Sequence, residues 1–158
     1  MMNRLITPRQ VVDLAFGEAE YLSEQAVSDA DIVAATSRYV VPIVGEELAE
    51  RLAEGEYSEL LNEYVAPALA AAVRYMIQPL ISLRTGDSGL VAPKGDYFAA
   101  PTKEAVAELQ LRLKCRMREL LKRLSDHLNS NSRSYAEYSA DSNILNRCLI
   151  DGGVVQIL

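Results

Sequence analysis

The sequence contains few of the residues that usually build metal sites. It has one histidine, two cysteines and no tryptophan, and aromatic residues make up only 6% of its 158 residues. Because it holds neither a C-x-x-C pair nor a second histidine, it lacks the ligand spacing of a zinc site. Cys115 and Cys148 are far apart in the chain and are interpreted as buried, small hydrophobic residues rather than as a disulfide.

Catalytic motifs are also missing. The sequence contains neither the G-x-S-x-G of a nucleophile elbow nor the G-x-x-x-x-G-K-[ST] of a phosphate-binding loop. His127 stands near the end of an expected helix, where a histidine commonly caps carbonyl groups. The pair Asp29-x-Asp31 is explained by helix capping instead of metal binding. We therefore expect no enzyme activity and no cofactor, although a site assembled between copies of the chain remains an alternative.

Long apolar runs are absent too. No run approaches the roughly 20 residues of a membrane span, and the N-terminus, MMNRLITPRQ, lacks the apolar core of a signal peptide. These absences predict a protein that is made and kept in a cytosol and has no membrane partner.

What the sequence does contain is a helical pattern rich in leucine, alanine and valine. Hydrophobic residues make up 49% of the chain, which favours a mainly α fold. In residues 57–84 apolar residues recur every four positions, as in a helix with a broad buried face. Within it the small residues 68–72 allow a neighbouring helix to approach closely. Pro67 and Pro79 predict a break or kink at each position.

Further helices are marked by their caps. Thr7-Pro8 starts a helix that stops at Gly17, and Ser28 starts a second one. A short acidic helix covers residues 46–54, before Gly55. The longest helix runs from Thr102 to Leu128, with a seam of apolar residues spaced by three or four. The seam comprises Val106, Leu109, Leu113, Met117, Leu120, Leu124 and Leu128, and Leu111 and Leu121 are expected to widen it.

The predicted fold is a helical bundle built on a long antiparallel helix pair, 57–84 with 102–128. We expect one domain, residues 1–158, with a helical core at 1–131 and a C-terminal extension at 132–158. The extension ends in a short strand at residues 154–158, rich in β-branched residues. Two interpretations of this strand are open: it augments a sheet of a neighbouring copy, or it folds back on its own domain.

A long loop, residues 85–101, joins the two helices of the pair. It contains three glycines and two prolines in 17 residues and is longer than compact domains usually carry. It is interpreted as a contact loop because it holds four large apolar residues, and a tolerated insertion is the alternative. The four residues are Leu90, Val91, Tyr97 and Phe98.

Charge is unevenly distributed along the chain. The formal net charge is −6, yet residues 13–63 hold 13 acidic residues and two basic ones, whereas residues 103–126 carry a local charge of +3. This asymmetry indicates complementary surfaces within or between molecules, or simply two solvated helix faces. Six bases flank the apolar seam: Arg112, Lys114, Arg116, Arg118, Lys122 and Arg123. Without aromatic residues between them, pairing with acidic helices is favoured over contact with nucleic acid.

Two segments carry a family resemblance. RYVVPIVGEELAERL, residues 38–52, is followed by YSELLNEYVAPALAAAV, residues 57–73, and Gly89-Leu90-Val91 precedes the last long helix. This succession of a helix closed by Pro and Gly, a short helix, a Tyr-x-x-Leu and a long helix resembles the head–tail connector, or head-completion, proteins of long-tailed phages and prophages. The resemblance covers about residues 5–131.

The resemblance implies a helical subunit that assembles into a ring beneath the portal at the capsid vertex. Its expected partners are other copies of itself and the portal and tail or neck proteins, and its expected location is the virion neck, or the host cytoplasm before assembly. It implies no catalysis and no cofactor. The alternative is a bacterial helical adaptor or regulator that binds a protein or nucleic acid through the six bases.

Overall fold

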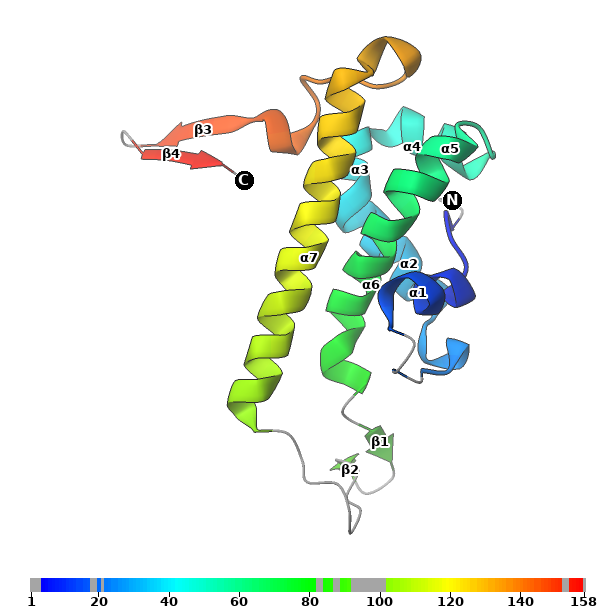
Figure 1. Cartoon of the computed structure of the whole chain (residues 1–158), viewed down its shortest axis with the longest axis vertical. Helices are drawn as coiled ribbons and strands as arrows, with labels where there is room; N and C mark the ends of the chain where they lie inside the picture. The colour runs from blue at the N-terminus through cyan, green and yellow to red at the C-terminus, as the bar shows by residue number, and fades with distance from the viewer. Residues whose placement is uncertain are drawn as a thin grey trace.

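The computed structural model describes residues 4–17, 20, 22–81, 84–86, 89–91, 102–151 and 154–157. The protein is mainly α, as predicted (Figure 1). Its α-helices are α1 (Pro8–Ala15), α2 (Asp29–Ala35), α3 (Val41–Val44), α4 (Glu46–Ala53), α5 (Ser58–Leu60), α6 (Ala66–Ile81) and α7 (Lys103–Ser130). Two π-helical turns, η2 (Thr36–Val40) and η3 (Leu61–Val65), and three short 3₁₀ turns, η1 (Glu24–Ala26), η4 (Ser132–Ser134) and η5 (Ile144–Asn146), complete the helical structure.

The helices begin where the capping residues predict. Thr7 accepts a hydrogen bond from the Gln10 amide, and the Gln10 side chain accepts one from the Thr7 amide in return. Ser28 and Asp31 form the same reciprocal pair at the start of α2. This capping box satisfies amides that the first turn of a helix leaves without partners. Asp31 is thus occupied by capping.

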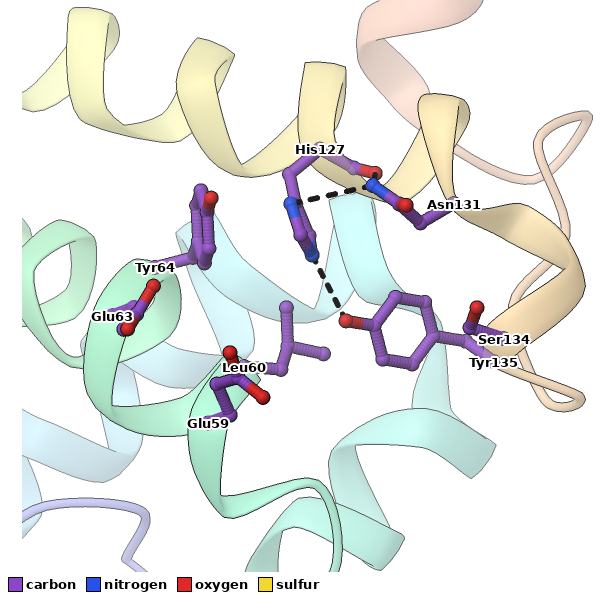
Figure 2. Close-up of a pocket in the computed structure, with 8 residues that line it drawn as sticks. All are labelled: Glu59, Leu60, Glu63, Tyr64, His127, Asn131, Ser134 and Tyr135. Atoms are coloured by element: carbon purple, nitrogen blue, oxygen red, sulfur yellow. Dashed lines mark hydrogen bonds between the residues drawn. The ribbon is translucent and has the colours of Figure 1, made fainter.

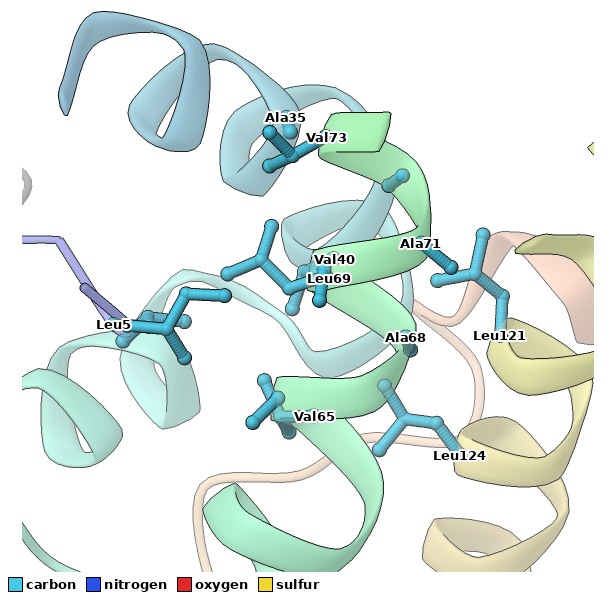
Figure 3. Close-up of a cluster of buried hydrophobic side chains, with 14 of the residues drawn as sticks. Leu5, Ala35, Val40, Val65, Ala68, Leu69, Ala71, Val73, Leu121 and Leu124 are labelled. Atoms are coloured by element: carbon cyan, nitrogen blue, oxygen red, sulfur yellow. The ribbon is translucent and has the colours of Figure 1, made fainter. Parts of the chain in front are cut away.

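Helix α6 is the centre of the molecule. It packs against α1, α2 and α7, which lie around it in Figure 1. Every residue from Ala68 to Val73 is buried, so this part of the helix has packing partners on all sides. Figure 3 shows Leu121 and Leu124 of α7 pointing toward Ala71 and Ala68, while Leu69 faces the helices on the other side. The short alanine side chains let the backbones of α6 and α7 approach closely.

Of the break or kink predicted at Pro67 and Pro79, the break is wrong at both positions, whereas the kink stays a prediction. Residues 58–81 form one continuous helix, and Pro79 also lies inside it. The turn before Pro67 is π-helical: the Ala66 amide donates to the Leu61 carbonyl, five residues back. The same arrangement precedes Pro42, where the Val41 amide donates to the Thr36 carbonyl. In both places the wider turn makes room for a proline ring that would otherwise meet the carbonyl four residues earlier.

Helix α7 is buried along only part of the predicted seam. Leu113, Met117, Leu124 and Leu128 are buried, whereas Val106 is 45% exposed and Leu109 37%. Off the seam, Leu121 is buried as expected. Two other expectations are wrong: Leu111 is 60% exposed, and Cys115 is exposed rather than buried. Both side chains lie on the exposed side of the helix.

After α7 the chain folds back against the end of that helix. Tyr138 is buried and Tyr135 packs against the core. The fully buried Asn143 donates to the hydroxyl groups of Ser125 and Tyr138, both at 2.8 Å, and accepts from the Leu145 amide at 2.9 Å. The tail is therefore held by a satisfied, buried hydrogen-bond network, which is costly to interrupt.

Two antiparallel strand pairs complete the chain. Strands β1 (Arg84–Gly86) and β2 (Gly89–Val91) pair at one end of the molecule, with Thr85 opposite Leu90. Strands β3 (Cys148–Asp151) and β4 (Val154–Ile157) pair with Cys148 opposite Ile157. The β3–β4 hairpin extends away from the helices in Figure 1.

One apolar stretch was underestimated from the sequence. Within the described residues, the helix at 58–81 is long and apolar enough to cross a membrane, with a mean hydropathy of 1.2 over 18 residues. Of that window, 56% is buried among neighbouring elements. The core helix of a soluble protein satisfies the same length and hydropathy criteria.

Candidate functional site

The six predicted interaction bases are all exposed and lie on two sides of α7, with Lys114, Arg118 and Lys122 on one side and Arg112, Arg116 and Arg123 on the other. Arg112 pairs with Glu108 at 2.6 Å and Lys122 with Asp126 at 2.9 Å, each within the same helix. The other four bases form no salt bridge with the residues that the structure describes. Among those residues, the acidic N-terminal half therefore forms no ion pair with the bases of α7.

The acidic half also keeps many free carboxylates. Arg51 forms salt bridges with three carboxylates: its guanidinium nitrogens lie 3.3–3.4 Å from carboxylate oxygens of Glu54, Glu56 and Glu137. These carboxylates, Glu56 first, raise the pKa of the Arg51 guanidinium. The remaining acids of residues 46–63 form no salt bridge within the described part of the chain: Glu46, Glu47, Glu50, Glu59 and Glu63.

The predicted contact loop is described only in part. Leu90 and Val91 lie in β2, and their side chains lie outside the described structure. Tyr97 and Phe98 lie outside the described residues, as do the other residues of 92–101.

The sequence did not reveal a buried ion pair on α6. Arg74 is only 7% exposed. Its guanidinium donates to Glu20 through two hydrogen bonds, at 2.6 and 2.9 Å, and also to the Ala15 carbonyl at the end of α1. The Phe16 ring centroid lies 4.3 Å from its Cζ. These contacts attach α1 to α6 through a side chain whose buried charge is fully paired.

The carboxylate of this pair has an altered acidity. The Arg74 hydrogen bond, followed by one from the Gly17 amide, lowers the pKa of Glu20 below its ordinary value. Arg116 of α7 contributes to the same lowering, as a smaller effect. Of the six predicted interaction bases, Arg116 is the one for which the described residues show an effect on the pKa of a carboxylate in the acidic half.

A second feature that the sequence did not reveal is a pocket at the C-terminal end of α7 (Figure 2). Its volume is about 150 Å³, and α5, η3, α7 and the turn after α7 contribute its walls. Two carboxylates, two tyrosines, one histidine, two small polar residues and one leucine line it. They are Glu59, Glu63, Tyr64, Tyr135, His127, Asn131, Ser134 and Leu60.

His127 is a wall of this pocket and does not cap the helix. Its ring stacks on Tyr64 with a centroid distance of 3.9 Å, and its Nε2 lies 2.9 Å from the Tyr135 hydroxyl. Asn131 supplies the cap, since its backbone and side-chain nitrogens both donate to the His127 carbonyl. The expectation for His127 is therefore wrong, because Tyr64 is brought to it from a distant part of the chain.

The side chain of Asn131 also lies close to the His127 ring. Its nitrogen, oriented by donation to the His127 carbonyl, lies 3.4 Å from Nδ1. The donor and acceptor roles of Nδ1 and of Nε2, which faces the Tyr135 hydroxyl, follow from the tautomer of the ring.

The electrostatics around the pocket are negative. Burial, followed by the charge of Glu59, raises the pKa of Tyr135. Nearby, Tyr57 packs edge-on against Tyr135 and donates to Glu137 at 2.9 Å, and this hydrogen bond raises the pKa of Tyr57. Ionised tyrosine is disfavoured in both places because carboxylates stand close by.

Among the described residues, no group of three or more His, Cys, Asp or Glu side chains is placed to hold an ion. Asp29 of the predicted capping pair is bound to Arg4, whose nitrogen lies 2.7 Å from its carboxylate.

A family model matches residues 36–147, and its description is a family of unknown function, DUF6712. The matched part runs from η2 through the central helices to the tail held by Asn143. No curated protein and no solved structure matches the chain. Because the model covers more than half of the sequence, the chain belongs to this family.

Proposed function

We propose that this member of the DUF6712 family is a non-enzymatic structural subunit that assembles with copies of itself into a ring. Its place is that of a head–tail connector or adaptor at the portal vertex of a tailed phage or prophage, with portal and tail or neck proteins as further partners. It is incorporated into the virion neck from the host cytoplasm and uses no cofactor.

The observation that supports assembly is the unneutralised charge of the two halves. Lys114, Arg116 and Arg118 are exposed on α7 without a salt bridge among the described residues, and the acidic helices keep free carboxylates of their own. Opposite charges that do not meet within one molecule are available to meet between copies. In a ring each copy offers both surfaces, one to each neighbour.

The finer architecture fits the same proposal. Under this proposal the antiparallel pair of α6 and α7 is the scaffold, with strands β1 and β2 at one end and the C-terminal strand near the other (Figure 1). A hairpin of two strands has open edges on both sides, so the C-terminal strand augments the sheet of a neighbouring copy. Under this proposal, loop and strand are contact elements that the helices hold in position.

The test is light scattering coupled to size-exclusion chromatography over a range of protein and salt concentrations. We expect mass to rise with protein concentration and to fall as salt screens the opposed charges. A triple variant, K114Q/R116Q/R118Q, should weaken association, whereas R38Q/R133Q/R147Q, which removes the same charge elsewhere, should not. A strict monomer at high concentration that also fails to bind a portal or tail protein would rule the proposal out.

The same exposed bases support a second candidate, a helical adaptor or regulator that binds nucleic acid. Retention on a DNA column at low salt, lost as salt increases, is its signature. The K114Q/R116Q/R118Q variant should then elute early, while R38Q/R133Q/R147Q should elute like the unmodified protein. No retention at low salt rejects nucleic-acid binding.

A further inference from the structure

We propose that the pocket between η3 and the end of α7 binds the guanidinium or ammonium group of a second copy, supplied by its Lys114 or Arg118. The inference rests on the proposed self-assembly and specifies one contact within it. It concerns a pocket that combines carboxylates, aromatic rings and hydroxyl groups (Figure 2).

The lining matches the chemistry of a cationic side chain. Glu59 and Glu63 offer carboxylate oxygens, and the Ser134 hydroxyl and the Tyr135 oxygen add neutral acceptors. The rings of Tyr64 and His127, which stack on each other, lie beside them. Guanidinium and ammonium groups donate hydrogen bonds only, and they bind favourably where acceptors and aromatic rings occur together.

The space is adequate for such a group. One water requires roughly 10–15 Å³ of cavity, whereas this pocket measures about 150 Å³. It is thus large enough for the head group and part of the stem of a lysine or arginine. An extended hydrophobic ligand is a poor match because Leu60 is the one aliphatic residue among the lining residues.

The charge of the site also selects a cation over an anion. Neither Glu59 nor Glu63 forms a salt bridge among the described residues. Arg123 lies 4.8 Å from the Tyr64 ring centroid. Within the molecule the Tyr64 ring therefore already contacts one guanidinium group, and the two carboxylates are the groups left for an incoming cation.

A second copy of the chain is the proposed occupant because its α7 carries exposed basic side chains whose charge is opposite to that of the pocket. Lys114 and Arg118 are one helical turn apart on α7 and project from one side of it. Both are exposed, and neither has a salt bridge in the described part of the chain. Their charge is complementary to that of the pocket, and a ring brings each such row to a neighbouring molecule.

The first experiment measures self-association of the full chain by sedimentation equilibrium. E59Q/E63Q removes the pocket charge with little change in shape and should weaken association about tenfold. The matched control, E104Q/D141N, removes the same charge from exposed positions outside the acidic half and should change association less than twofold. Circular dichroism verifies that each variant is folded.

A double-mutant cycle then identifies the partner residues. K114Q/R118Q should weaken association as strongly as E59Q/E63Q, and the combined variant should be little weaker than either. Additive losses would show that the two surfaces do not meet and would overturn the proposal. Equal losses in E59Q/E63Q and E104Q/D141N would also overturn it, while leaving assembly itself intact.

The second experiment tests the pocket without assembly. N-acetyl-arginine methylamide is titrated into ¹⁵N-labelled protein, with N-acetyl-norleucine methylamide as the uncharged control. We expect amide shifts at Tyr64, His127 and Tyr135 with the arginine compound alone, and their loss in E59Q/E63Q. If these shifts are absent, the proposal that the pocket binds a cation is wrong. If they occur in a protein that never self-associates, the pocket binds cations but a second copy is not its occupant, and the proposed assembly is wrong as well.

Discussion

The two halves of α7 carry one sequence pattern but have different surroundings. From Leu113 to Leu128 the apolar positions are buried against α6 and the tail, whereas Val106 and Leu109, on the same seam, remain substantially exposed. The first half has a single described hydrogen bond to α6, from the Gln110 side chain to the Tyr75 carbonyl at 2.9 Å. Periodicity identifies residues that share a helix face, and it does not reveal whether another element covers that face.

The difference follows from what lies opposite on α6. The second half of α7 faces Ala68 and Ala71, whose small side chains allow leucines to pack deeply (Figure 3). Beyond Ile77 the exposure of α6 itself increases, with Leu80 67% exposed. Burial of apolar area is the main favourable contribution to folding, so the stability of α7 should be concentrated in its second half.

The largest expected effect is at the centre of the buried half. Leu124→Ala removes a side chain with no exposed surface and should lower the free energy of unfolding by about 3 kcal/mol. Leu109→Ala, the same change on the exposed half, should cost less than about 1 kcal/mol. Urea denaturation followed by circular dichroism measures both. Similar losses would contradict the contrast between the halves.

A slightly smaller effect is expected from overpacking the contact. Ala68→Leu places three additional carbon atoms where α6 meets α7 and should destabilise the protein by about 2 kcal/mol. Ala107→Leu makes the same change on the exposed half, where the side chain has room, and should be within about 0.5 kcal/mol of the unmodified protein. Thermal unfolding distinguishes the two. A neutral Ala68→Leu would show that α6 and α7 are not in close contact.

The next effect concerns the tail, which covers the buried half alone. Asn143→Ala leaves the Leu145 amide and the Ser125 hydroxyl without their buried partner and should cost about 1–2 kcal/mol. Asn62→Ala, at an exposed position in η3, serves as the control and should be nearly neutral. Hydrogen exchange should show faster opening at the end of α7 in the first variant. Unchanged exchange there would mean that the tail does not protect the helix.

The smallest effect tests how the Arg74–Glu20 pair holds α1 on α6, on a side of α6 away from the α7 leucines. Glu20→Gln should cost about 1 kcal/mol or less near neutral pH, since Glu20 is partly exposed and solvent screens the pair. The folded state lowers the pKa of Glu20. The stabilisation by the ion pair is therefore fully present above about pH 4.3, the pKa of a glutamate in an unfolded chain, and it disappears as the pH falls through the lower pKa of the folded state.

Urea titrations of both proteins between acidic and neutral pH measure this dependence. The difference in the free energy of unfolding between the unmodified protein and Glu20→Gln should disappear as the pH is lowered. Glu24→Gln, at an exposed carboxylate outside the Arg74 contact, provides the matched comparison and should show no such closing gap. A gap that persists at the lowest pH would indicate that Glu20 acts through packing and not through its charge.

Much of the fold could be predicted from the sequence because its signals are local. Thr7, Ser28 and Thr102 start helices by accepting hydrogen bonds from amides three residues ahead. Gly45 and Gly55 follow the ends of α3 and α4. Their φ angles are +87° and +90°, where a residue with a side chain would be strained. The mainly α class follows from such caps and from apolar spacing. The exposed positions of the six α7 bases follow from the same spacing.

The candidate pocket could not be predicted, because its parts come from distant segments. His127 meets Tyr64 across 63 positions of the chain and Tyr135 across eight. A lone histidine on an amphipathic helix gives no sign of such partners. Arg74, within an apolar stretch, gave a weak signal: a charge there requires a partner, but nothing in the sequence identified Glu20.

The sequence by itself determined the helices, their caps, the apolar face of α6 and the separation of acidic from basic halves. These depend on interactions within one or two helical turns, which neighbouring residues specify. Only the tertiary structure decided which half of α7 is buried, how the π-helical turns accommodate Pro42 and Pro67, and how Tyr64, His127 and Tyr135 come to share a pocket. Those outcomes depend on which surfaces meet in the folded chain, where packing, desolvation and charge act between residues that the sequence keeps far apart.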